Sequence, residues 1–205
     1  EAEREIAAAE RLGGMLLAWG DAGYPPLLAR VEDAPPLVYA AGDVAVSDLP
    51  AVAIVGSRNC SAVGRRMAAT IAAQLAHEGF AVVSGLARGI DAAAHEASLA
   101  TGTIAALAGG LGRLYPPEHA GLADAIRERG LLLTEMPPDW IAKAKDFPRR
   151  NRIISGVAYG VIVVEAAARS GTLITARFAL EQGREVFAVP GSPLDPRAEG
   201  TNRLI

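Results

Sequence analysis

Short, continuously apolar segments alternate with longer amphipathic or alanine-rich segments along most of this 205-residue sequence. The apolar segments lack the strict alternation of a half-buried strand, which is typical of a parallel sheet covered by helices on both faces. The length and the 51% content of hydrophobic residues allow one such core. We therefore predict the α/β class, with a mostly parallel, doubly wound sheet of the extended Rossmann-like type.

Each element follows from one of these segments. The predicted strands are 51–56, 80–85, 103–110, 131–136, 160–166 and 185–191. The predicted helices are 64–79, 89–102, 118–130, about 148–158 and 171–183. Residues 1–34 read as a helix ending at Gly13–Gly14 and then a linker punctuated by glycine and proline. We predict an N-terminal helical and linker extension over 1–34, interpreted as a remnant of a helical domain, and a main domain over 35–205.

Bulk properties exclude several classes of protein. No apolar run approaches the roughly 20 residues that cross a bilayer, and no signal peptide opens the chain, so we expect no membrane insertion. The single Cys60 excludes an internal disulfide and fits a reducing cytoplasm. A net charge of −3 argues against a protein that coats nucleic acid with its whole surface, but it permits a local basic cleft. Because the chain starts at Glu1 without a methionine, we expect a fragment of a longer protein.

The segments that follow the predicted strands share one kind of chemistry. They are short, contain glycine or arginine, and precede helices, so they expose backbone N–H groups and helix N-termini that favour anions. In doubly wound folds these segments meet at the carboxyl edge of the sheet, where ligands bind. The candidate anion-binding residues are Gly56, Ser57, Arg58, Gly85, Arg88, Gly89, Arg149, Arg150, Arg152, Ser170, Gly171, Thr172 and Thr175.

Three of these arginines stand at the predicted start of a helix. Pro148 suits the first helical position, so we expect Arg149, Arg150 and Arg152 to surround that helix's N-terminus. They would then line an anion site and not the core.

Less specific interpretations stay open for single segments. The Gly56–Arg58 segment could form only a tight turn, and Asp91 could be an ordinary residue of a helix's first turn. Ser170 could serve only as an N-cap, and at least one of the arginines could be solvated without binding a ligand. Asp91 and His95 are four residues apart and could face a metal, but no third ligand is evident, and a packing role is favoured. Recognised catalytic motifs and the strict dinucleotide-binding fingerprint are absent, so we predict no catalytic residue, no metal and no cofactor.

Taken together, "VAIVGSR", "VVSGLARGIDAAAH", "FPRRNRIISG", "VIVVEAAARSGTLITA" and "GREVFAVPGS…GTNRLI" resemble the bacterial DNA-processing protein A (DprA/Smf) family, over roughly residues 24–205. The resemblance implies an extended Rossmann domain that binds single-stranded DNA. It also implies protection of incoming strands during natural transformation, help in loading the RecA recombinase, a homodimer, and no enzymatic activity.

The resemblance also assigns residues. It places the DNA pocket at Ser57 and Arg58, at the Gly85–Asp91 loop, and at Phe147, Arg149, Asn151 and Arg152, with the Ser170–Thr175 turn beside them. The ring of Phe147 would either stack on a base or pack under the helix. The dimer surface would involve Asn202, Leu204 and Ile205. The chain departs from the family at Pro117, where a lysine is common, and it stops at "NRLI", without the winged-helix-like domain that can follow.

Two other functions use the same fold. Phosphoribohydrolases carry a P-G-G-x-G-T-x-x-E motif, but here Thr175 takes the place of the glutamate, and Glu165 is the carboxylate left to replace it. A sensor of small nucleotides would use the same anion-binding edge without a polymer, and it would show a weaker dependence on salt.

Overall fold

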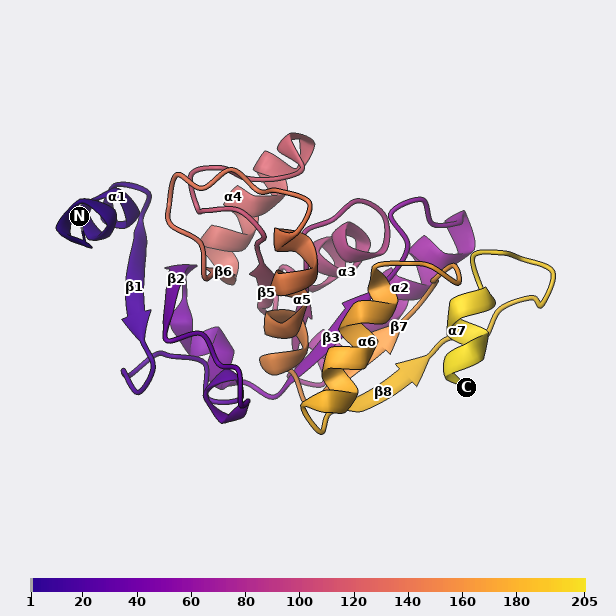
Figure 1. The fold of residues 1–205 in the computed structure, drawn as a ribbon. Helices are drawn as coiled ribbons and strands as arrows, with labels where there is room; N and C mark the ends of the chain where they lie inside the picture. Colours follow the sequence, from indigo (N-terminus) through magenta and orange to yellow (C-terminus); the bar gives the residue numbers. More distant parts are fainter. Residues whose placement is uncertain (1) are drawn as a thin grey trace.

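The computed structural model describes residues 2–205 as one mixed sheet with helices on both faces (Figure 1). The strands are β1 (Gly14–Ala18), β2 (Leu37–Gly42), β3 (Ala51–Val55), β4 (Ala81–Ser84), β5 (Thr103–Ala106), β6 (Leu131–Thr134), β7 (Gly160–Val163) and β8 (Glu185–Ala188). The α-helices are α1 (Ala2–Arg11), α2 (Ala62–His77), α3 (Ile90–Ser98), α4 (Ala120–Arg129), α5 (Asp146–Gly156), α6 (Thr172–Glu181) and α7 (Glu199–Leu204). The predicted fold class is confirmed.

The order of the strands is β1-β2-β6-β5-β4-β3-β7-β8. From β6 to β8 every neighbouring pair is parallel, whereas β1–β2 and β2–β6 are antiparallel. The chain proceeds from β3 through β4 and β5 to β6 in one direction, and then returns to the other side of β3 to form β7. The boundary between β3 and β7 is therefore the switch point at which a doubly wound sheet binds its ligands.

The helices form two layers that bury alternate residues of the same strands. On one face α5 and α6 pack through Ile153 and Ala176 against residues such as Ala53 and Val55 of β3. On the other face α2 and α3 cover Ile54, and α4 covers Leu132 and Ala105. Both faces of the central strands are thus apolar, which explains why these strands read as continuous hydrophobic runs. Figure 1 shows α5 and α6 in front of the sheet and α2, α3 and α4 behind it.

The N-terminal segment departs from the sequence expectation. The predicted first helix is present as α1, but β1 follows it directly at Gly14 and pairs with β2, so residues within 1–34 extend the same sheet. The linker after β1 is also fixed in place, because the buried Tyr24 hydroxyl donates to the carbonyl of Pro35 at 2.6 Å. The termini lie at opposite ends of the sheet (Figure 1).

Other differences concern element boundaries. The parallel strands are shorter than predicted at their carboxyl ends, and α5 begins at Asp146, two residues before Pro148. Pro148 therefore lies within the first turn of α5 and not at its first position. Within residues 2–205 no helix combines the length and the apolar character that a membrane crossing needs.

Candidate functional site

A hollow of about 660 Å³ opens at the carboxyl ends of β3 and β7, at the switch point of the sheet. We call it the first hollow. Segments after β3, β4 and β7 meet there with the first turn of α5. Its lining includes Gly56, Ser57, Arg58, Asn59, Asp91, Phe147, Arg150, Asn151, Arg169, Ser170, Gly171, Thr172 and Thr175. The structure thus brings together predicted residues from four separate segments of the sequence.

The two loops after β3 and β4 approach each other through glycine. A Cβ at Gly56 would lie 2.5 Å from the side chain of Ile90, so a larger residue would push the loop away from α3. Gly89 has a φ of +78°, and a side chain there would collide with the backbone of Ser57. Both glycines are therefore required for a close backbone approach that sets one wall of the first hollow.

The opposite wall is the start of α6. The hydroxyl of Thr172 donates to the carbonyl of Gly56 at 3.0 Å, which ties α6 to the β3–α2 loop. Ser170 accepts a hydrogen bond from the N–H of Thr172 at 3.2 Å, but the residue at the N-cap position of α6 is Gly171 and not Ser170. Thr175, one turn further, is buried and lines the first hollow.

Arg58 is the most available cation of the site. Its guanidinium lies 5.4 Å from the centre of the Phe147 ring, a cation–π distance. The side chain is exposed, and no carboxylate of residues 2–205 forms an ion pair with it. An exposed guanidinium without a carboxylate partner, placed against an aromatic ring, can bind a phosphate while the ring contacts a base.

Phe147 is half-buried and stands at the boundary of the first hollow. Tyr115 packs against it edge-to-face, with ring centres 5.3 Å apart and an angle of 71° between the planes. Tyr115 belongs to the loop after β5, so this loop adds an aromatic side chain beside Phe147 and Arg58.

Arg150 lies at the floor of the first hollow and is 5% exposed. Its Nη1 donates to the carbonyl oxygens of Gly85 and Ala106, each at 2.5 Å. Burial lowers the pKa of Arg150 to about 10, while the carboxylate of Asp91 opposes that shift. Burial also raises the pKa of Asp91, although Arg150 and the N–H groups of Ala87 and Gly85 favour its charged form.

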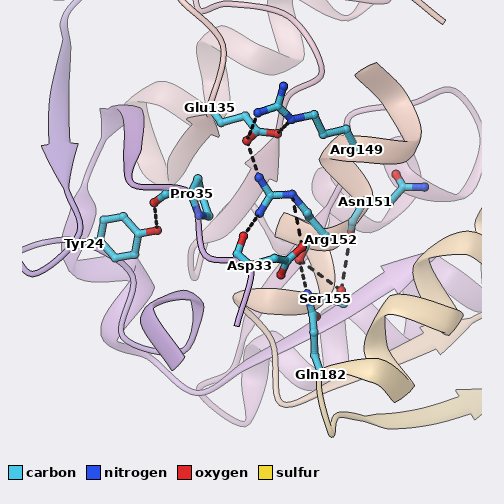
Figure 2. A network of polar contacts seen from close by, with 9 residues as sticks. All are labelled: Tyr24, Asp33, Pro35, Glu135, Arg149, Asn151, Arg152, Ser155 and Gln182. Atoms are coloured by element: carbon cyan, nitrogen blue, oxygen red, sulfur yellow. Dashed lines mark hydrogen bonds and ion pairs between the residues drawn. The ribbon is translucent and has the colours of Figure 1, made fainter. Parts of the chain in front are cut away.

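Arg149 and Arg152, two of the three arginines of α5 that we expect at an anion site, do not line the first hollow. Both form ion pairs with Glu135, whose side chain is 4% exposed, and Arg152 also pairs with Asp33 at 3.7 Å. Figure 2 shows Glu135 between the two guanidiniums, with Asp33 on the far side of Arg152. Arg152 is 11% exposed and lies among these groups, so it joins α5 to the N-terminal linker instead of facing the first hollow.

Asn151 points away from this network (Figure 2), and its side-chain amide donates to the carbonyl of Gly171 at 3.3 Å. It therefore bridges α5 and the start of α6 across the first hollow. Among the expected residues of α5, Phe147, Arg150 and Asn151 line this hollow, whereas Arg149 and Arg152 do not.

The remaining predicted residues belong to the β4–α3 loop. Gly85 is in contact with the buried Arg150, and a Cβ there would lie 2.5 Å from its Nη1. Arg88 is exposed, forms an ion pair with Glu118 and lies beside the first hollow, not inside it. His95 accepts a hydrogen bond from the N–H of Leu86 and contacts the hydroxyl of Thr103, and Asp91 accepts from the N–H of Gly85, so both side chains have partners within the fold. Residues 2–205 contain no group of three potential metal ligands.

Sequence reasoning missed three residues of the site. Asn59 and Arg169 line the first hollow and are neighbours in sequence of predicted residues, and both are exposed. Tyr115 follows the third parallel strand in "GRLYPP". An aromatic residue soon after a predicted strand was a sign of a possible site residue, but the sequence does not show that Tyr115 contacts Phe147.

Glu165, the carboxylate left to replace the hydrolase glutamate, forms hydrogen bonds with Ser61. It accepts hydrogen bonds from the N–H of Ser61 at 2.9 Å and from the Ser61 hydroxyl at 2.5 Å. Ser61 in turn caps α2 by accepting from the N–H of Gly64. Glu165 thus anchors the start of α2.

Comparison with known proteins agrees with this fold. The chain is 44% identical over 205 residues to the DNA processing protein DprA of Bacillus subtilis, of which the match covers 69%. It is 48% identical over 185 residues to the protein Smf of Escherichia coli, of which the match covers 50%.

A solved structure of DNA processing protein A from Helicobacter pylori, described for its single-stranded DNA binding mode, superposes with a TM-score of 0.86. The identity is 30%, and the match covers 93% of this chain and 86% of that one. The chain spans between half and about two thirds of the two curated relatives. Residues 15–205 match the model of the DNA recombination-mediator protein A family, and the chain belongs to this family.

Proposed function

We propose that this chain binds single-stranded DNA without regard to sequence, in the first hollow, as part of DNA processing. The observation that carries the proposal is the pairing of Arg58 with the ring of Phe147 at the switch point of the sheet. Arg169 is a second exposed arginine that lines the same hollow. The relationship to a structure described by its single-stranded DNA binding mode supports the same assignment.

The chemistry of the site favours a strand over a duplex. Base stacking on an aromatic side chain needs an unpaired base, and it tolerates any base because each has a π-face. An arginine beside the ring can hold the adjacent phosphate. The glycines of the neighbouring loops keep the backbone close enough to the ligand for its N–H groups to contribute.

The finer parts of the function follow from family membership. We propose that the protein protects incoming strands in natural transformation and assists loading of the RecA recombinase, without enzymatic activity of its own and in the cytoplasm. The engagement of Glu165 with Ser61 supports the non-enzymatic part, since a hydrolase of the related fold needs a free carboxylate near Thr175.

We also propose self-association through the C-terminal end of the sheet. Phe187 on the edge strand β8 is 55% exposed, and Leu204 and Ile205 at the end of α7 are 36% and 75% exposed. Asn202 exchanges two hydrogen bonds with Gly191 at 3.0 Å, which holds α7 beside the segment after β8. Sedimentation of the Leu204→Glu variant beside the unmodified chain tests this face, because a charge in an apolar interface should shift the protein toward the monomer.

Titration of a fluorescent oligonucleotide, single-stranded and then duplex, at two salt concentrations tests the main proposal. The single strand should bind more tightly, with an affinity that falls as salt rises through counterion release. Arg58→Ala should weaken binding and lower the magnitude of the salt slope by about 0.7, the share of one phosphate contact to a single strand.

Arg129→Ala is the matched control, since Arg129 is exposed at the carboxyl end of α4, which lies at the opposite edge of the sheet from the first hollow. Equal binding of strand and duplex, or an Arg58→Ala titration that matches the control, would remove the proposal. A small-nucleotide sensor would instead bind mononucleotides as tightly as the oligonucleotide.

A further inference from the structure

Two smaller hollows continue from the first along the carboxyl edge of the sheet. The second hollow, about 190 Å³, lies between the loops after β4 and β5. The third, about 380 Å³, lies between the starts of α2 and α3. Arg58 and Asn59 line all three hollows, and Arg88 lines the second and third. Because the same residues border successive hollows, the three hollows adjoin one another along this edge of the sheet.

The boundary between the first and second hollows is aromatic. Phe147 lines both, and Tyr115 forms part of the second only. Tyr115 is 49% exposed and is held edge-to-face against Phe147. Its ring thus adds a second aromatic surface next to the first, inclined to it by 71°, and Arg58 lines both hollows.

The third hollow is lined by two arginines that form weak, exposed ion pairs with carboxylates. Arg65 pairs with Glu96 at 3.2 Å, with both side chains more than half exposed, and Arg88 pairs with Glu118 in a similarly exposed setting. Exposed pairs of this kind contribute little to stability. A phosphate can therefore replace Glu96 or Glu118 as the partner of either arginine at small cost to the fold.

We propose that the bound strand does not end in the first hollow: it passes over Phe147 and Arg58, places a base against Tyr115 in the second hollow, and continues into the third, where Arg65 and Arg88 hold its backbone. This inference rests on the proposed function and specifies the path of the polymer at that site. It assigns a binding role to Tyr115 and Arg65, which lie outside the first hollow.

Oligothymidylates from about 4 to about 16 nucleotides, the range of site sizes of single-strand binding modules, test the path. Affinity for the unmodified chain should rise with length until the three hollows are filled. Arg65→Ala should reduce the affinity for long oligonucleotides and lower the magnitude of their salt slope by about 0.7, and it should leave the shortest unaffected. The control is Arg66→Ala, because Arg66 is the next residue of α2 and lies outside the third hollow.

Tyr115 has a matched control as well. Tyr115→Leu should weaken binding by about fivefold or more, the low end of one base stack. Tyr159→Leu changes a tyrosine that is 55% exposed but lines none of the three hollows, and it should leave binding unchanged. An oligonucleotide carrying 5-iodouracil should cross-link to Tyr115 on irradiation, and mass spectrometry of the peptides locates the adduct.

The outcomes separate the two proposals. An unmodified chain that binds no oligonucleotide of any length rejects the proposed function itself. If the unmodified chain binds but Arg65→Ala matches Arg66→Ala at every length, or Tyr115→Leu matches Tyr159→Leu and the cross-link falls elsewhere, the path is wrong while the first hollow stands.

Discussion

Arg150 donates hydrogen bonds from one guanidinium nitrogen to the carbonyl of Gly85, at the end of β4, and to that of Ala106, at the end of β5. A helix on one face of the sheet thereby holds the ends of two parallel strands beneath the first hollow. The contact depends on glycine, since a Cβ at position 85 would lie 2.5 Å from the same nitrogen. A charged side chain that resembled a ligand contact in the sequence is thus part of the frame that shapes the site.

Replacement of Arg150 by methionine should lower the free energy of unfolding by about 3 kcal/mol, because two buried carbonyls lose their donor. Arg150→Lys keeps a charge and a donor near Asp91 and should lose less. Urea unfolding of the three proteins measures the difference. A methionine variant as stable as the unmodified chain would show that water or a rearranged side chain satisfies both carbonyls.

Arg149 and Arg152 offer an internal comparison, since both pair with the buried Glu135 but differ in burial. Arg152→Ala should lower the free energy of unfolding by about 3 kcal/mol, because a buried carboxylate loses its buried partner and Asp33 is released. Arg149→Ala, at a side chain that is 58% exposed, should cost less than about 1 kcal/mol. Equal losses of stability in the two variants would make Arg152 a candidate binding residue again. The same conclusion would follow if a folded Arg152→Ala protein bound single strands less tightly.

The arginine cluster also shows where sequence reasoning succeeds and where it stops. Successive residues of a helix point about 100° apart, so Arg149, Arg150 and Arg152 cannot all face one hollow. The sequence could have excluded three equivalent ligand contacts, but it could not decide which arginine faces inward. That depends on the start of α5 at Asp146 and on Glu135, which belongs to another segment.

The parallel sheet was predictable because its central strands are apolar on both faces, and such continuous apolar runs can be recognised without knowledge of a partner strand. The antiparallel edge was not. β1 and β2 lie beside glycine- and proline-rich segments. The pairing of β1 with β2, and of β2 with β6, is a long-range contact that the local sequence pattern does not predict. Likewise, the residues of the first hollow could be listed from the loops after the strands, but the contact of Tyr115 with Phe147 joins two of those loops in space.

A substitution of Phe147 tests whether its ring contributes to binding by stacking on a base or by packing within the protein. Phe147→Leu keeps an apolar side chain at the start of α5 but removes the ring, so it should weaken binding of a single strand by about 1–3 kcal/mol at every salt concentration. The salt slope should not change, because no phosphate contact is lost. Oligonucleotide titrations at several salt concentrations measure both quantities. A lower slope would mean that the ring acts by positioning Arg58, which lies over it.

His95 gives the fold a predictable dependence on pH. Its Nε2 accepts from the N–H of Leu86 at 3.3 Å, and its Nδ1 lies 2.8 Å from the hydroxyl of Thr103, which itself donates to the carbonyl of Val82. The neutral ring with its proton on Nδ1 satisfies all of these groups, whereas a second proton on Nε2 would face the N–H of Leu86. Burial, with the charges of Arg150 and His119, lowers the pKa of His95 to about 3.

Below the ordinary histidine pKa of about 6.5 the unfolded chain therefore binds a proton that the folded chain does not, and stability falls as the pH decreases toward 3. Between pH 7 and pH 5 this amounts to about 2 kcal/mol. His95→Gln should be less stable at pH 7 but should lack this part of the pH dependence, while His77→Gln, at an exposed histidine, should keep it. The comparison between variants cancels the opposite contribution of Asp91, whose raised pKa favours the folded state in acid. Urea unfolding at pH 5, 6 and 7 measures the slopes, and parallel curves for the unmodified chain and His95→Gln would show that the ring titrates freely in the folded protein.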